Sequence, residues 1–259
     1  MKASYHTHTY RCHHAFGREE EYIEKAIAED IKILGFSDQA PMPYKNGYTS
    51  HYKMQPSEID EYFSVLLSLK KKYEGQIERK IGFETEYYPS LWEECLRFWE
   101  PYPIDYFILG QHALLHEGPS ENYSSLRFEN IERLRLYADT VIEGMNTGII
   151  TYVAHPDLIN YTGSDTEAYL SEMRRIILEA NRLKMPLEYN LLGMAEKRNY
   201  PRLDFWREAA RLGAEVIIGC DSHSPDRVAD KRELSMAQEF LASLSLKALD
   251  EIELKKVKI

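Results

Sequence analysis

The chain has 259 residues, 44% of them hydrophobic and 29% charged, a composition that excludes an intrinsically disordered protein. Its 32 basic and 42 acidic residues give a net charge of −10, which disfavours binding to nucleic acid. No apolar run approaches the ~20 residues of a membrane span. The three cysteines form no Cys-x-x-Cys pair, so we expect a reducing, cytoplasmic compartment.

Short apolar runs alternate with longer amphipathic segments along the whole chain. The apolar runs predict strands at 3–8, 31–37, 77–84, 105–111, 149–155, 186–190 and 215–221. The other segments predict helices at 19–29, 57–73, from 90 onward, 126–145, 166–183, 203–212 and 226–244. The patterns that start at Ser57 and Ser90 are typical of helix capping boxes.

Almost continuously apolar strands, each followed by a helix, are typical of a parallel sheet covered on both faces. Two architectures fit this order: an open doubly wound sheet, and a closed TIM-type barrel with one unit fewer. The first predicted strand is not followed by Gly-x-Gly-x-x-Gly, which disfavours a dinucleotide-binding open sheet. No Pro-, Gly- or Ser-rich linker divides the chain, so we expect residues 1–259 to form one domain.

Potential metal ligands recur where the predicted strands end. They are His6, His8, His14, Asp38, Gln39, Glu84, His112, His155, Asp221 and His223. The carboxyl ends of barrel strands converge on one opening, and residues i and i+2 of a strand share a face. Imidazole and carboxylate ligands suit zinc, iron or manganese, and Glu84 is placed to bridge two ions. We expect His13, His51 and His116 to lie outside this site.

The ordered motifs resemble the polymerase and histidinol phosphatase (PHP) family, and its histidinol-phosphatase branch in particular. They include Tyr5-His6-Thr7-His8, Leu34-Gly35-Phe36-Ser37-Asp38, Gly82-Phe83-Glu84, Ala154-His155-Pro156-Asp157 and Gly219-Cys220-Asp221-Ser222-His223. The resemblance implies a distorted (βα)7 TIM-like barrel, with two or three divalent metal ions at the carboxyl ends of its strands.

The resemblance also implies which residues hold each ion. His6, His8, Glu84 and Asp221 would bind the first, and the second would share Glu84 and take His112 and His155. The third would use His14, His223 and position 39. The family usually has His where this chain has Gln39, and an amide oxygen is the poorer ligand, so we expect the third ion to be weakened or absent.

The implied activity is hydrolysis of L-histidinol phosphate to histidinol and phosphate, in histidine biosynthesis, by attack of a metal-activated hydroxide. Asp38 and Asp221 are the candidates to protonate the leaving group. Arg198 matches a phosphate-contacting position, whereas Asn160 stands where the family has a basic residue. Glu117 is a candidate partner for the substrate amine.

Two other functions fit the same residues. Asn160 favours a PHP-family phosphoesterase for another phosphomonoester or for a phosphodiester. A non-catalytic, metal-stabilised PHP module is the second alternative. In the catalytic cases, the expected partner is a small phosphorylated molecule, and neither nucleic acid nor a membrane is expected.

Overall fold

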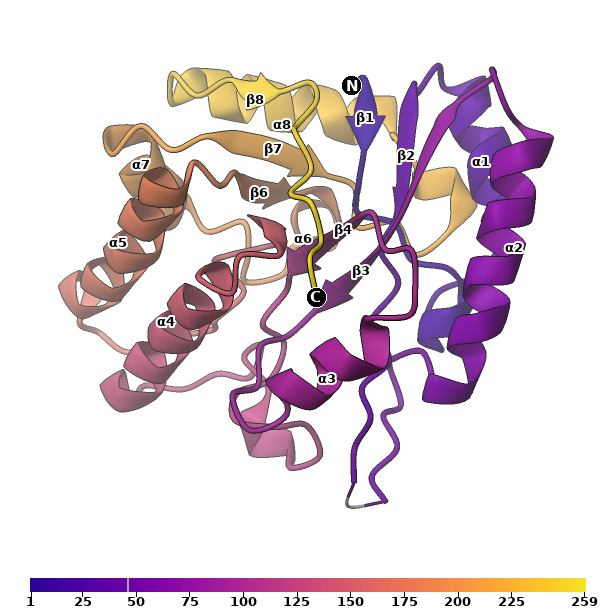
Figure 1. The fold of residues 1–259 in the computed structure, drawn as a ribbon. Coiled ribbons are helices and arrows are strands. Elements are labelled where there is room, and N and C mark those ends of the chain that lie inside the picture. Colours follow the sequence, from indigo (N-terminus) through magenta and orange to yellow (C-terminus); the bar gives the residue numbers. More distant parts are fainter. Residues whose placement is uncertain (46) are drawn as a thin grey trace.

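The computed structural model describes residues 1–45 and 47–259, and a parallel sheet of eight strands lies at its centre (Figure 1). Neighbouring strands in the sheet are also neighbours in the chain. The strands are β1 (Ala3–Ser4), β2 (Ile33–Phe36), β3 (Glu78–Thr85), β4 (Tyr106–Leu109), β5 (Ile150–Val153), β6 (Leu187–Asn190), β7 (Val216–Gly219) and β8 (Ala248–Leu249). The seven predicted strands are therefore confirmed in position.

Helices between the strands lie around the outside of the curled sheet, except the short α6, whose Leu192 lines the cavity described below (Figure 1). They are α1 (Glu19–Ala28), α2 (Ile59–Lys72), α3 (Trp92–Trp99), α4 (Ile131–Met145), α5 (Thr166–Leu183), α6 (Leu191–Ala195), α7 (Leu203–Arg211) and α8 (Lys231–Ser243). In the part of the chain that the structure describes, no helix combines the length and the hydropathy that a membrane crossing requires.

The sheet curls until the chain beyond β1 meets the chain beyond β7. Thr7 forms a parallel bridge with Ser222, and the His8 amide donates to the Ser222 carbonyl at 2.9 Å. At the opposite end, β8 pairs with β7, and Lys2 forms an ion pair with Glu251. This arrangement is the expected distorted TIM-like barrel, with the strand ends that carry His6, His8 and Asp221 brought side by side.

Several elements differ from the sequence prediction. β8 and α6 were not predicted, because two and five residues are too short to show a periodic pattern. The helix expected from residue 126 begins at Ile131, where the Asn130 side chain accepts from the Glu132 amide at 2.8 Å. The capping boxes expected at Ser57 and Ser90 were wrong, since α2 and α3 have no side-chain cap there.

Two glycines let the side chain of Tyr106 cross the interior of the sheet. A Cβ atom at Gly35 would overlap the Tyr106 hydroxyl, and one at Gly82 would overlap its ring. The hydroxyl donates to the Tyr5 carbonyl at 2.6 Å, directly before His6. Tyr106 thereby ties β4 to the segment that carries the first two predicted ligands.

Candidate metal centre

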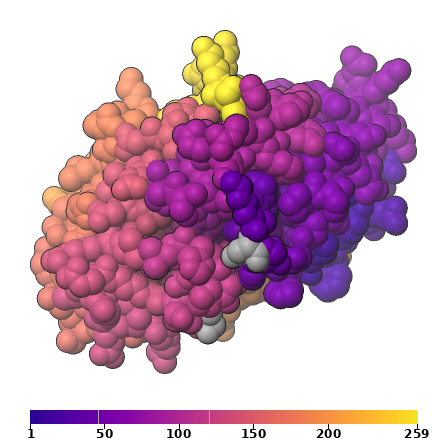
Figure 2. Space-filling view, turned by 60° about the horizontal axis from the view of Figure 1, so that its bottom comes forward, coloured from indigo at the N-terminus to yellow at the C-terminus, as the bar shows by residue number. Residues whose placement is uncertain are grey.

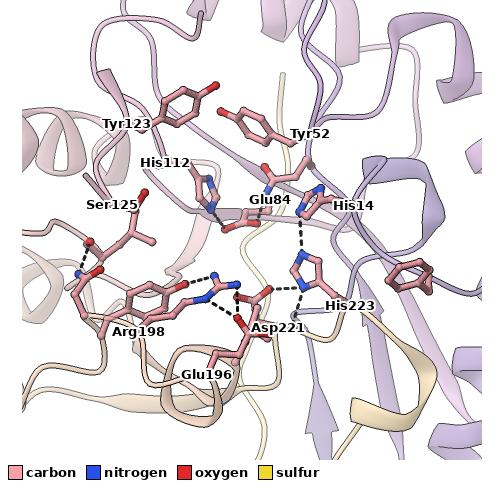
Figure 3. A pocket seen from close by; sticks show the side chains of 16 residues that line it. His14, Tyr52, Glu84, His112, Tyr123, Ser125, Glu196, Arg198, Asp221 and His223 are labelled. Atoms are coloured by element: carbon pink, nitrogen blue, oxygen red, sulfur yellow. Dashed lines mark hydrogen bonds and ion pairs between the residues drawn. The ribbon is translucent and has the colours of Figure 1, made fainter. Parts of the chain in front are cut away.

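The carboxyl ends of the strands open into a cavity of about 660 Å³ (Figure 3). Six of the predicted ligands line it, namely His14, Gln39, Glu84, His112, Asp221 and His223. The segment that carries Tyr44 and Tyr52 lies against the segment that carries Glu117 and Tyr123. Tyr44 donates to Glu117 at 2.6 Å, and the rings of Tyr52 and Tyr123 lie 5.9 Å apart. Figure 2 shows this side of the molecule, with the segment that carries Tyr44 and Tyr52 in dark violet and the segment that carries Glu117 and Tyr123 in magenta.

Glu84, at the end of β3, stands between two groups of imidazoles. Its Oε2 lies 3.3 Å from the Nε2 atoms of both His6 and His8. Its Oε1 lies 2.9 Å from His155 Nε2 and 3.5 Å from His112 Nε2. Asp221 Oδ1 approaches His8 Nε2 to 3.2 Å. One carboxylate therefore faces two potential cation positions, one on each oxygen.

The backbone is shaped to bring these side chains together. A Cβ atom at Gly110 would overlap Glu84 Oε1, so the chain next to this carboxylate has room for glycine alone. His155 and Asp221 have φ angles of 30° and 49°, in the left-handed region that side chains rarely adopt. Such strain is concentrated at functional sites, where surrounding structure holds it in place.

The buried polar atoms of this cluster lack partners. His6 Nε2, both ring nitrogens of His8, His155 Nδ1 and Glu84 Oε1 have no hydrogen bond, although more than nine in ten buried polar groups in proteins do. The ring atom His6 Nδ1 lies 2.8 Å from Glu188 Oε2. A proton shared there leaves the Nε2 lone pair of His6 facing the cluster, as in metal-binding histidines.

His14 and His223 form a second imidazole group. Each Nδ1 lies within hydrogen-bond distance of a carbonyl oxygen, at 2.7 Å from Cys12 and 2.9 Å from Asp221 respectively. Since a carbonyl only accepts, both Nδ1 atoms carry the proton and both Nε2 atoms present lone pairs. These Nε2 atoms are 2.9 Å apart, a repulsive arrangement that a shared cation converts into ligation.

Protonation states differ between the two imidazole groups. Desolvation in the cavity, with the charge of His8, lowers the pKa of His14 to about 4 and that of His223 to about 3. Burial opposes ionisation of Glu84, yet His112 and His6 hold the pKa of its carboxyl well below the usual range. Burial opposes the charge of His6, His8 and His112, but the carboxylates beside them raise the pKa of each ring. A divalent cation would therefore bind these three rings in exchange for protons, since imidazole binds metal in its neutral form. The residues present therefore fit a divalent metal ion.

In each of three groups of side chains, the potential ligand atoms lie within 4.8 Å of one another. These groups are His6–His8–Asp221, His6–Glu84–His155 and His8–Cys12–His223. Cys12 was not among the predicted ligands, and its Sγ donates to the Thr9 carbonyl at 3.2 Å. His13, His51 and His116, which were expected outside the site, are absent from the described residues that line the cavity.

Gln39 contacts Glu84 instead of the His14–His223 group. Its Nε2 donates to Glu84 Oε2 at 2.5 Å, and its Oε1 accepts from Lys53 Nζ at 3.5 Å. An ammonium group can only donate and a carboxylate can only accept, so these two neighbours fix which way the amide points. Gln39 thus offers its N–H₂ group, and not its oxygen, to the carboxylate at the centre of the cluster.

Lys53 is a buried cation that sequence reasoning missed. It forms an ion pair with Glu86, and its Nζ lies 3.2 Å from Glu117 Oε1. Glu86 in turn lies 3.1 Å from the Nδ1 atom of His112. Nothing in the sequence marks Lys53, because it lies in a segment without periodicity. Glu188, the partner of His6, was also missed. Its position could have indicated it, because it shares a face of the strand with Asn190, two residues later at the carboxyl end.

Three residues with predicted roles lie elsewhere. Asp38 accepts from the Thr9 amide at 2.6 Å and from its hydroxyl at 2.9 Å, and so holds the turn after His8. Glu117 is buried against Lys53 and Tyr44, where it balances charge instead of facing a substrate. Asn160 donates to the Ser125 carbonyl at 2.9 Å. In the described parts of the chain these three do not line the cavity, whereas Arg198 does.

Comparisons with known proteins agree with the fold and the motifs. The family model described as PHP domain matches residues 4–190. A probable histidinol-phosphatase of Deinococcus radiodurans is 25% identical over 228 residues, which cover 86% of each chain. A histidinol-phosphatase of Bacillus subtilis is 28% identical over 120 residues, or 44% of this chain and 45% of the relative.

Solved structures show the same architecture. The histidinol phosphate phosphatase of Lactococcus lactis, in complex with zinc, L-histidinol and phosphate, gives a TM-score of 0.73 at 18% identity. That match covers 97% of this chain and 98% of the other. A putative histidinol phosphatase of Listeria monocytogenes gives 0.72 at 21% identity, covering 90% and 99%. With more than half of its length matched by the family model, the chain belongs to the PHP domain family.

Proposed function

We propose that this protein hydrolyses L-histidinol phosphate to histidinol and phosphate with the help of two or three divalent metal ions. The observation that supports this most directly is the meeting of unpartnered imidazole nitrogens around Glu84, in a cavity that also contains Arg198. Relatives that match most of the chain are named probable histidinol-phosphatase. Zinc, L-histidinol and phosphate are bound in the similar Lactococcus structure, which favours zinc over iron or manganese.

The contacts suggest how the ligands are divided. His6, His8, Asp221 and one oxygen of Glu84 surround the first position. The other oxygen of Glu84, with His112 and His155, surrounds the second. His14 and His223 provide two nitrogens for a third. Because the Gln39 oxygen faces Lys53, this third position lacks a ligand from residue 39 and should bind its ion least tightly.

Bound divalent cations lower the pKa of a water molecule and neutralise the oxygens of the phosphate. The residues of the chain orient these components. Glu188 and Glu86 fix the rings of His6 and His112 through their Nδ1 atoms. Arg198, whose guanidinium faces the cavity, supplies charged donors to the phosphate. Leu158 and Leu192 form apolar parts of the wall and exclude water from the leaving group.

A kinetic screen joined to metal analysis tests this function. The purified protein is expected to contain divalent metal, to hydrolyse L-histidinol phosphate, and to lose the activity on chelation and regain it with zinc. Glu84→Gln should retain the fold and lose at least ~100-fold in kcat, because neither cation position keeps its bridging charge. Metal-loaded protein that hydrolyses no phosphoester would indicate the non-catalytic module.

The same screen distinguishes the other catalytic alternative. Asn160 is occupied by the Ser125 carbonyl and adds no positive charge, which leaves room for a substrate other than L-histidinol phosphate. A higher kcat/KM for a different phosphomonoester or for a phosphodiester would show that L-histidinol phosphate is not the preferred substrate. The proposed metal-dependent hydrolysis would still stand.

We also propose that residues 1–259 act as one domain, since β1 and β8 belong to the same sheet.

A further inference from the structure

An ion pair between Glu196 and Arg198 forms part of the cavity wall (Figure 3). Glu196 directly follows α6, and its Oε2 accepts from Arg198 Nε at 2.9 Å and from Nη2 at 2.7 Å. The third nitrogen, Nη1, donates to the Tyr200 hydroxyl at 2.8 Å. The ring of Tyr200 lies 5.5 Å from that of His155. The pair therefore stands beside the candidate metal ligands.

Within the part of the cavity wall that the structure describes, Glu196 is the one acid that the metal cluster does not use. Among the described residues that line the cavity, the acids are Glu84, Asp221 and Glu196. The first two face the imidazoles of the cluster, and Glu117 is buried behind Lys53. A positively charged group entering the cavity would thus find at Glu196 a carboxylate that is paired with Arg198 alone and takes no part in the metal cluster.

We propose that Glu196 binds the ammonium group of a phosphorylated amino alcohol while Arg198 binds its phosphate. This inference rests on the proposed function and deepens it, because it names the residue that selects substrates with an amine. The resting ion pair opens on binding, and each partner takes the oppositely charged group of the substrate. One pair within the protein is replaced by two pairs with the substrate, so neither side chain is left as an unpaired charge.

The resting pair is suited to such an exchange. The side chains of Glu196 and Arg198 are 47% and 42% exposed, so solvent screens their attraction and little stability is lost when they part. In a 2-amino-alcohol phosphate, two carbons separate the ammonium nitrogen from the ester oxygen. The two charges of the substrate are therefore about as close together as the two members of the pair.

A pair of substrates that differ in one group tests the proposal. L-Histidinol phosphate and its des-amino analogue share the phosphate and the imidazole, and only the first carries an ammonium group. In Glu196→Gln the KM for L-histidinol phosphate should rise about tenfold, the size expected for a hydrogen bond between charged groups. Its kcat should stay within about twofold, since uniform binding is lost. The KM of the analogue should stay the same or fall, because Arg198 is released from its competitor.

Two control variants define the outcomes. Glu132→Gln removes the same charge from a surface pair with Arg135 outside the cavity wall, and should change neither substrate's KM. Glu196→Asp keeps the charge and should recover most of the discrimination. An equal change for both substrates in Glu196→Gln, or none for L-histidinol phosphate, would overturn the role of Glu196. Wild-type protein that hydrolyses neither substrate would overturn the proposed function itself.

Discussion

Lys53 connects two residues of the cluster through separate contacts. Its ammonium donates to Oε1 of Gln39, and the Nε2 group of the same amide donates to Glu84. The ammonium also pairs with Glu86, whose carboxylate contacts the ring of His112. Burial opposes the charge of Lys53, yet Glu117 and Glu86 raise its pKa. Through these contacts Lys53 orients both the Glu84 carboxylate and the His112 imidazole, which face each other at the second candidate cation position.

Lys53→Met should destabilise the protein by about 3–5 kcal/mol, because Glu86 and Glu117 would be left buried without a cation. Denaturant unfolding measures the loss. Lys45→Met is the matched control, since Lys45 lies in the same segment, 77% exposed, and pairs with Glu94. It should change the unfolding free energy by at most about 1 kcal/mol. Similar losses in the two variants would argue against the role of Lys53.

Gln39→His tests whether residue 39 decides the number of bound ions. Lys53 and Glu84 hold the Gln39 amide, whereas an imidazole at position 39 would offer a nitrogen ligand to the cavity that His14 and His223 also line. We expect metal content, measured by elemental analysis, to rise by about one ion per chain. Wild-type protein that already holds three ions would show that residue 39 is not the limiting ligand.

At the scale of elements, apolar runs were sufficient to locate seven strands, because a strand covered on both faces is apolar along its length. They also placed His6, Glu84 and Asp221 at one end of the sheet, since parallel strands end together. Glu58 shows the limit of local patterns. Its carboxylate accepts from the Gln55 amide at 2.7 Å, two residues before the capping box predicted at Ser57.

Contacts between distant segments were beyond the sequence pattern. Lys53 meets Glu117 across 64 positions of the chain, and no periodicity in either segment indicates the pairing. Asp38 was predicted to protonate the leaving group and Glu117 to bind the substrate amine, because both acids stand close to predicted ligands in the sequence. Their actual partners, Thr9 and Tyr44, come from other loops, and only the folded chain shows that these acids are already occupied.

Glu208 joins α7 to α5 through charge. It accepts from Arg211 on its own helix at 2.6 Å and from Arg174 on α5 at 2.5 Å. The hydrogen bond from Arg211, with that from Arg174, lowers the pKa of Glu208 to about 2 from an ordinary 4.5. The folded pKa is the lower one, so the stabilisation is complete above pH 4.5 and is lost as the pH falls toward 2.

Glu208→Gln should therefore lower the unfolding free energy by about 1 kcal/mol at pH 7, since partly exposed arginines give modest gains. The difference in unfolding free energy between Glu208→Gln and wild type, measured by urea unfolding, should become smaller as the pH falls from 4.5 to about 3. Glu167→Gln, which removes a 73% exposed partner of Arg174, should have a smaller effect at every pH. A difference that is independent of pH would mean that packing, and not charge, joins the helices.

At the scale of the whole molecule, the candidate metal centre joins the first and last parts of the barrel. Its side chains come from the ends of β1, β3, β5 and β7 and from the loops beside them. The bridge between Thr7 and Ser222 is the backbone contact that closes this end, and His8 and Asp221 flank it. Cations held between these side chains would therefore cross-link segments more than 200 residues apart.

Metal removal should consequently loosen the barrel as a whole. At 100 times the dissociation constant, a bound ion stabilises the folded state by ~2.7 kcal/mol. For a protein of this size that corresponds to roughly 5–10 °C in Tm. Dialysis against a chelator should lower the Tm by about this amount, and titration with zinc should restore it in a concentration-dependent way. Glu84→Gln should abolish most of the zinc-dependent rise, because both cation positions lose a charged oxygen. An equal Tm with and without metal would show that the imidazoles and carboxylates meet for a reason other than ligation.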